Sequence, residues 1–186
     1  MYNAKMRFQF FSCLFSLVCL GLCYSRGFAQ DVENLLELAQ QQKEKGNLKA
    51  AIKCYDRAIS QQPEQATYYQ NRGALRYELD DLKGAIEDCE KALSLNKNLA
   101  DCQFNLGIIY YRLANYTQAL QYFNSFLKNK RNDSEAWYWR GKTKQKLNDK
   151  IGACADWREA KRLGSTLVND YLSNYCTQNA ENSLEK

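Results

Sequence analysis

Apolar and polar residues alternate along this chain with the period of amphipathic helices. In the segment GNLKAAIKCYDRAI, which begins at Gly46, apolar side chains recur at spacings of three and four, and the other positions are mostly polar or charged. This spacing places the apolar residues on one face of a helix. Short breaks that allow the chain to reverse separate such segments, at Gly46-Asn47, Asp80-Asp81, Ala114-Asn115 and Asn148-Asp149. The pattern predicts an all-α fold of helical hairpins.

The hairpin pattern recurs every 34 residues, in four units that span 32–65, 66–99, 100–133 and 134–165. Glycine or alanine occupies the eighth place of each unit, and alanine occupies the twentieth, at Ala51, Ala85, Ala119 and Ala153. The twenty-fourth place holds Tyr55, Cys89, Phe123 and Trp157. This combination resembles the tetratricopeptide repeat (TPR) family. The resemblance implies four helix-turn-helix units that stack into an α-solenoid.

Charged residues at two places of the repeat change together. The seventh place is Leu38 and Leu106 in units one and three, but arginine in units two and four, where the twenty-third place is aspartate. Because these places can face each other on antiparallel helices, we expect structural ion pairs within the repeats. An arginine aimed at a ligand carboxylate is the alternative. The predicted pairs are Arg72 with Asp88 and Arg140 with Asp156.

Residues 1–29 have the organisation of a signal peptide. Lys5 and Arg7 precede a mostly apolar run from Phe8 to Cys23, and small residues suit cleavage after Ala29. We therefore expect an exported protein, periplasmic or secreted, that begins at Gln30. An uncleaved segment would instead anchor the chain in a membrane, although the run is shorter than the ~20 apolar residues of a typical span.

Charge gives little support for nucleic-acid binding. The whole chain has 26 Lys and Arg against 21 Asp and Glu, and loss of Lys5, Arg7 and Arg26 would leave 23 against 21, a net charge of +2 instead of +5. Such a domain lacks the basic stripe that attracts phosphate backbones. The cluster of Lys128, Lys130 and Arg131 is interpreted as a solvated loop. We expect no nucleic-acid partner.

Cysteine usage favours a disulfide over a metal site. Signal cleavage would leave five of the eight cysteines, and the chain has no histidine and no C-x-x-C motif, so we expect neither a metal nor another cofactor. A turn at Gly164-Ser165 lies nearly midway between Cys154 and Cys176, which would bring both to similar height on neighbouring helices. The tail also resembles the closing unit of exported bacterial repeat proteins. We predict a Cys154–Cys176 disulfide, with two reduced thiols in contact as the alternative.

The end of the chain is expected to close the stack. Residues 166–176 form a predicted capping helix at the end of a domain that spans 30–176, and the polar tail 177–186 is expected to fray. The apolar stripe that would cover the fourth unit consists of Leu167, Val168, Tyr171, Leu172 and Tyr175.

The TPR resemblance implies that the first helix of each unit lines a concave groove for a peptide or protein segment. Several residues at the inward places are large and apolar or aromatic, typical of a partner site. The alternative is that the rings pack between helices and expose only their edges. The predicted partner-binding residues are Leu36, Gln70, Tyr77, Phe104, Ile108, Tyr111, Tyr138 and Lys142.

The lysine and asparagine that clamp a C-terminal carboxylate in some family members are absent from the first two units, which favours a ligand with apolar anchors. A catalytic function is not expected, because the chain has no histidine for a nucleophile pair and no G-x-x-x-x-G-K phosphate loop. We therefore predict an exported protein-interaction module. The alternative function is a scaffold of an envelope complex, held at the membrane by an uncleaved N-terminal segment.

Overall fold

The computed structural model describes residues 31–177, and this part of the chain is helical without any strand. The chain divides into two compact units at Pro63 and Glu64. The described residues of the first unit form a hairpin of residues 31–44 and α2 (Leu48–Gln61). The predicted all-α fold of paired helices is confirmed.

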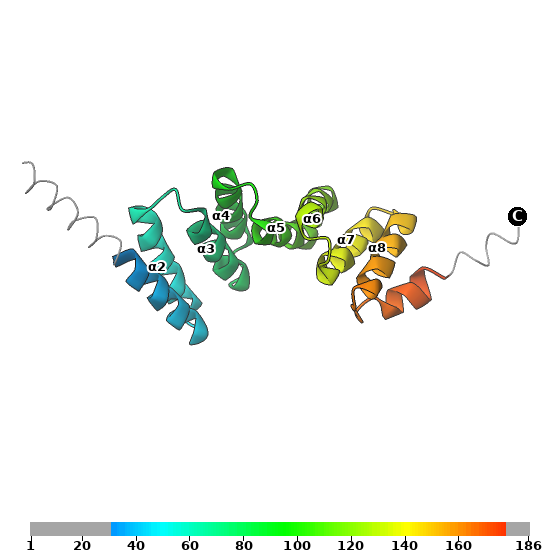
Figure 1. Ribbon diagram of the computed structural model, residues 1–186, viewed down its shortest axis with the longest axis horizontal. Helices are drawn as coiled ribbons and strands as arrows, with labels where there is room; N and C mark the ends of the chain where they lie inside the picture. Colours follow the sequence, from blue (N-terminus) through cyan, green and yellow to red (C-terminus); the bar gives the residue numbers. More distant parts are fainter. Residues whose placement is uncertain (1–30, 178–186) are drawn as a thin grey trace, which may run out of the picture. The chain divides into compact units, whose positions relative to one another are not determined.

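The second unit contains three hairpins and a short final element (Figure 1). Helices pack in consecutive pairs, α3 with α4, α5 with α6 and α7 with α8, and each pair contacts the next. The α5 helix also contacts both α3 and α7, so the first helices of the hairpins lie side by side. The elements are α3 (Ala66–Glu78), α4 (Leu82–Leu95), α5 (Ala100–Arg112), α6 (Tyr116–Asn129), α7 (Ser134–Lys146), α8 (Lys150–Arg162) and the π-helix η1 (Tyr171–Tyr175).

The turns inside these hairpins use one residue in the left-handed conformation. Asp80, Ala114 and Asn148 have φ values of 63°, 57° and 62°. In the first of these turns, Asp80 N donates to Tyr77 O and Asp81 N donates to Arg76 O, the two bonds of a Schellman motif. The breaks in the hydrophobic pattern therefore mark the reversals of the chain.

Small residues at the eighth place allow the helices of a pair to approach closely. A Cβ atom on Gly107 would lie 2.7 Å from Phe123 Cε1, and one on Gly141 would lie 2.5 Å from Trp157 Nε1. Both rings belong to the second helix of the same hairpin and are fully buried. The aromatic residue at the twenty-fourth place thus occupies the space that glycine leaves open.

The last element covers the end of the fourth hairpin but is shorter than expected. Residues 169–175 are helical, against the predicted 166–176, and the tail lies largely outside the described residues. Val168 is fully buried against α8, whereas Leu167 is 61% exposed and does not join the apolar stripe. Residues 167 and 168 still belong to the turn before the helix. Helical periodicity therefore does not determine which of their side chains is buried.

Cys154 and Cys176 are brought together by this covering segment. Their sulfur atoms lie 2.06 Å apart, at disulfide distance, and their Cα atoms 5.8 Å apart. The other described cysteines, Cys54, Cys89 and Cys102, are buried. A hydrogen bond with Cys102 and burial raise the pKa of the Cys89 thiol, so it stays protonated at neutral pH.

The predicted signal segment 1–29 lies outside the described residues. Within residues 31–177, no helix combines the length and the apolar character that crossing a membrane requires.

Candidate functional site

The first helices of the second unit bring aromatic rings and one lysine together. The group contains Tyr111 from α5, Tyr138, Trp139 and Lys142 from α7, and Tyr171 from η1, and we call these five residues the aromatic–lysine patch. All five are half-buried. The patch therefore combines fixed positions with partly accessible rings.

Lys142 lies at the centre of the patch. Its Nζ atom is 4.7 Å from the ring centroid of Trp139 and 5.5 Å from those of Tyr111 and Tyr138. The negative faces of aromatic rings attract a cation at these distances. No carboxylate in the described part of the chain pairs with this ammonium group. Lys142 is thus held in position while its hydrogen-bond donors remain available to a carbonyl or carboxylate of a ligand.

The rings of the patch support one another. Tyr111 and Trp139 meet edge to face with centroids 5.4 Å apart, and Tyr138 meets Tyr171 in the same way at 5.8 Å. A hydrogen bond with Tyr138 raises the pKa of Tyr171, and burial raises it further. Burial also raises the pKa of Tyr111. The phenols of Tyr111 and Tyr171 are therefore neutral near pH 7 and can both donate and accept hydrogen bonds.

Tyr77 of α3 lies beside a second cation. The guanidinium of Arg112 is 5.4 Å from the Tyr77 ring centroid, and its Nη2 atom lies 2.6 Å from Asp80 Oδ1. This exposed ion pair connects α5 to the turn that follows α3. Tyr77 and Tyr111 thus each contact a cation from the next repeat. Arg112, beside Tyr77, already pairs with Asp80, whereas Lys142, beside Tyr111, has no such carboxylate within residues 31–177.

Two predicted partner-binding residues belong to the packing between helices instead. Phe104 lies 5.9 Å from Phe123 and 5.2 Å from Phe126 between ring centroids, and Ile108 is only 8% exposed. Phe126 stands at a place where the repeat pattern expects a small residue, and its ring packs against Phe104. Phe104 thus packs between helices, as the alternative interpretation describes, and Ile108 is buried, whereas Tyr111 of the same helix is half-buried in the patch.

The remaining predicted partner-binding residues lie apart from the patch. Leu36 is half-buried in the first compact unit, which is described separately. Gln70 of α3 donates from Nε2 to Asp101 Oδ2 of α5 at 2.8 Å. Its amide thus connects two neighbouring first helices.

The predicted ion pairs form two buried charge clusters. Arg72 donates from Nε and Nη2 to Asp88 at 2.9 and 2.6 Å, and Arg140 donates in the same bidentate way to Asp156 at 2.8 and 2.7 Å. Both aspartates are 2% exposed. Salt bridges of this geometry hold the two helices of a hairpin together, which is a structural role.

Each cluster also contains a second cation that the repeat comparison missed. Arg76 lies 3.0 Å from Asp88 and Lys144 lies 2.9 Å from Asp156. Both occupy the eleventh place, where units one and three have Gln42 and Tyr110. The same alternation between units was present in the sequence, and it would have identified these cations.

Trp139 was also absent from the predicted site. It occupies the sixth place, where the other units carry Glu37, Asn71 and Asn105. A tryptophan at an otherwise polar place is the signal that could have identified it.

Among the described residues, no group of three or more potential ligands could hold a metal ion.

Comparison with known proteins supports the same architecture. Models of the TPR repeat and the tetratricopeptide repeat match residues 40–80 and 76–142, respectively. The chain belongs to the tetratricopeptide repeat family. A search of curated proteins gives no match.

Several solved TPR structures are similar in fold. MamA 41-end from Desulfovibrio magneticus RS-1 has a TM-score of 0.76 at 15% identity, covering 83% of this chain and 90% of its own. YrrB, described as a TPR protein with an unusual peptide-binding site, has a TM-score of 0.66 at 22% identity and covers 74% of each chain. The first TPR of Spaghetti (RPAP3), bound to the HSP90 peptide SRMEEVD, has a TM-score of 0.60 at 24% identity, and the match covers 64% of this chain and 97% of its own.

Proposed function

We propose that this chain is a protein-interaction module that binds a peptide or protein segment on the face formed by α3, α5 and α7. The aromatic–lysine patch carries this proposal. Tyrosine and tryptophan supply much of the binding energy in protein interfaces, and Lys142 adds a fixed donor among them. Two of the similar structures are described as peptide-binding or peptide-bound TPR proteins, which supports a ligand of this kind.

The ligand is an extended or helical segment with apolar anchors. Its side chains pack on Tyr111, Tyr138 and Trp139, and one carbonyl or carboxylate oxygen accepts a hydrogen bond from Lys142. Since the aromatic rings already hold the ammonium in place, little side-chain entropy is lost when the ligand binds. We assign the chain no catalytic role.

A peptide-display selection tests this function. Peptides selected on the native protein should bind at least about tenfold more weakly to Lys142→Ala and Tyr138→Ala variants, since each removes part of one contact cluster. Lys146→Ala, an exposed change one turn further along α7, is the matched control. Circular dichroism verifies that each variant is folded. Equal binding by the native protein and both patch variants would refute this assignment.

We further propose that the protein is exported and that the Cys154–Cys176 bridge forms in an oxidising compartment. A disulfide closing a loop of 22 residues contributes about 3 kcal/mol in the chain-entropy description. Peptide masses with and without reductant test the bridge, and the mass of the first residue of the expressed protein tests cleavage after Ala29. An intact N-terminus in the membrane fraction would favour the anchored scaffold instead.

A further inference from the structure

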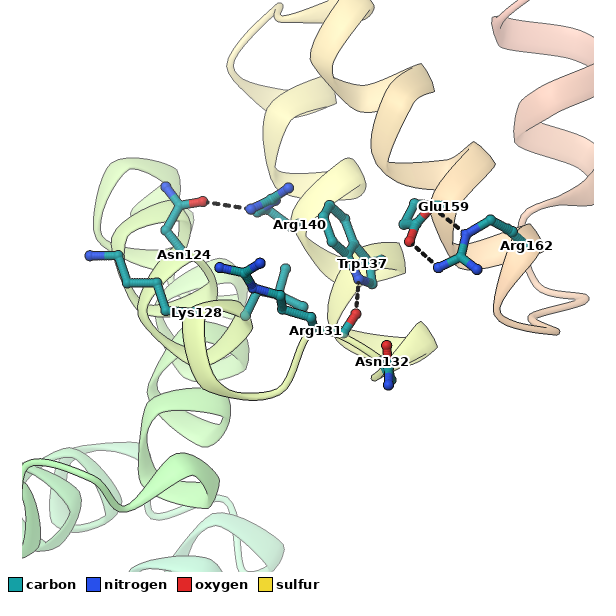
Figure 2. Close-up of a pocket in the computed structure, with 9 residues that line it drawn as sticks. Asn124, Lys128, Arg131, Asn132, Trp137, Arg140, Glu159 and Arg162 are labelled. Atoms are coloured by element: carbon teal, nitrogen blue, oxygen red, sulfur yellow. Dashed lines mark hydrogen bonds and ion pairs between the residues drawn. The ribbon is translucent and has the colours of Figure 1, made fainter.

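A basic pocket lies beside α7 (Figure 2), and the α7 residues that line it are not those of the aromatic–lysine patch. At 3.6 residues per turn, Trp137 and Arg140 lie on one side of the helix, nearly opposite Trp139 and Lys142. The pocket has a volume of about 730 Å³. Its lining residues come from α6, the loop before α7, α7 itself and the end of α8, and they are Asn124, Leu127, Lys128, Arg131, Asn132, Trp137, Arg140, Glu159 and Arg162.

The charges in this pocket do not balance. Four cationic side chains line it against one carboxylate, Glu159. Arg162 takes both oxygens of that carboxylate, at 2.8 and 2.5 Å. Arg140 is held by Asp156 and by Asn124 Oδ1, the latter at 2.9 Å. Lys128 and Arg131 are the two cationic side chains of the pocket that have no carboxylate partner among the described residues, and Arg140 shares Asp156 with Lys144.

Neither Lys128 nor Arg131 forms an ion pair within the described part of the chain, and both are exposed. The interpretation of this cluster as a solvated loop is therefore incomplete, because its side chains border a hollow. Figure 2 shows both side chains beside the same opening. Their two charges can reach a ligand without breaking an existing salt bridge.

The floor of the pocket is partly apolar, and side-chain contacts connect its elements. Trp137 Nε1 donates to Arg131 O at 2.7 Å, which fixes the loop to α7. The Arg140 guanidinium lies 4.4 Å from the Trp137 ring centroid, and Leu127 is 4% exposed. Asn124 and Asn132 add amide groups at the rim. A ligand would therefore meet two free cations, amides and an aromatic surface.

We propose that this pocket binds an acidic peptide segment of a partner protein, with glutamate or aspartate side chains paired to Lys128 and Arg131. Charge complementarity favours this occupant, since carboxylates pair with the two exposed cations and Trp137 offers a surface for an apolar side chain between them. The site lies apart from the aromatic–lysine patch. A single chain could thus hold two segments at once.

Fluorescence anisotropy with a labelled peptide that contains four glutamates and two leucines tests the proposal. The native protein should bind it, and binding should weaken as salt rises. The Lys128→Gln/Arg131→Gln variant should bind about tenfold more weakly or worse, since two charge-assisted contacts are lost. A peptide with glutamine in place of every glutamate should show a similar loss.

Matched controls separate this site from general charge effects and from the proposed function. The variant Lys83→Gln/Lys97→Gln removes the same charge from the second repeat, where Lys97 occupies the place of Arg131, and should bind the acidic peptide normally. Lys142→Ala should also bind it normally, although the same change is expected to weaken binding at the aromatic–lysine patch.

Three results would overturn the proposal. The first is equal binding of the acidic peptide by the native protein and the Lys128→Gln/Arg131→Gln variant. The second is undiminished binding of the glutamine peptide. The third is selective binding of inorganic phosphate or anionic phosphatidylserine vesicles, lost in the same variant, while the acidic peptide does not compete.

Discussion

The hairpin α5–α6 and the hairpins on either side of it solve one packing problem in different ways. In α3–α4 and α7–α8, places seven, eleven and twenty-three hold two cations around a buried aspartate. In α5–α6 the same places hold Leu106, Tyr110 and Tyr122, and the two tyrosine rings stack with centroids 5.5 Å apart. One repeat geometry thus accepts either a charge cluster or an aromatic stack.

The difference shows what the repeat requires at these places. Both solutions pair side chains across the space between the two helices. A charge cluster also fixes the relative orientation of its side chains, because a guanidinium group binds a carboxylate in one geometry. The aromatic stack relies on area and ring geometry, which do not depend on salt. The fold needs matched partners at places seven, eleven and twenty-three, but it does not need a particular chemistry.

The largest expected effect comes from removing the anion of one charge cluster. Asp156→Ala should lower the free energy of unfolding by about 3 kcal/mol, because Arg140 and Lys144 would remain partly buried without their carboxylate. Urea unfolding followed by circular dichroism measures the change. Glu37→Ala, at an exposed position of the first helix, is the control and should change stability by less than about 0.5 kcal/mol.

A second variant introduces the residues that α5–α6 carries at places seven, eleven and twenty-three into the hairpin α7–α8. The combined change Arg140→Leu, Lys144→Tyr and Asp156→Tyr should cost far less than Asp156→Ala, since a buried ion pair can be replaced by packed apolar groups at little cost. If the triple variant is as unstable as Asp156→Ala, the two solutions are not interchangeable.

Glycine at the eighth place should be more critical beside an aromatic ring. Gly141→Ala and Gly107→Ala should each destabilise the protein by about 2 kcal/mol, because the new methyl group would overlap Trp157 or Phe123. At Gly73 the nearest side-chain atom is Asp88 Cβ at 3.1 Å, so Gly73→Ala should cost less. Unfolding midpoints of the three variants measured in parallel test this order.

Disrupting the aromatic stack should lower the free energy of unfolding by less than removing the aspartate of a charge cluster. Tyr122→Leu should lower stability by about 1 kcal/mol, the value of a ring pair beyond its buried area. The loss should be the same at low and high salt, whereas the loss for Asp156→Ala should depend on salt because Lys144 and Arg140 are not fully buried. A salt-dependent effect of Tyr122→Leu would contradict this account.

The smallest expected effect concerns the turn of the same hairpin. Ala114 adopts a φ of 57°, which costs a residue with a Cβ atom about 1 kcal/mol, so Ala114→Gly should stabilise the protein by up to that amount. Asn148→Gly should gain less, because asparagine tolerates this conformation. Thermal unfolding of the two variants compares them directly.

The sequence predicted the helical hairpins and their ion pairs because both depend on regular spacing. Arg140 and Asp156 could be paired by comparing equivalent places in different repeats. Place eleven alternates in the same way, with Gln42, Arg76, Tyr110 and Lys144, and so carries the signal for the second cation. Periodicity could not separate groove from core on α5, where buried residues occur on every side of the helix, so the burial of Ile108 and the ring packing of Phe104 could not be predicted.

The basic pocket was beyond the reach of sequence patterns for a different reason. Lys128 and Arg131 are close in the chain, but the carboxylate and the guanidinium on the other wall, Glu159 and Arg162, belong to a helix that follows an intervening one. Only packing of α7 between α6 and α8 determines that these groups share a hollow.

The alternation of charged and uncharged hairpins has a consequence for how such a chain can lengthen or shorten. Units one and three share leucine at place seven, and units two and four share the arginine and aspartate set. Adding or removing hairpins two at a time would therefore keep the alternation at place seven, whereas adding or removing a single hairpin would place two hairpins of the same kind next to each other.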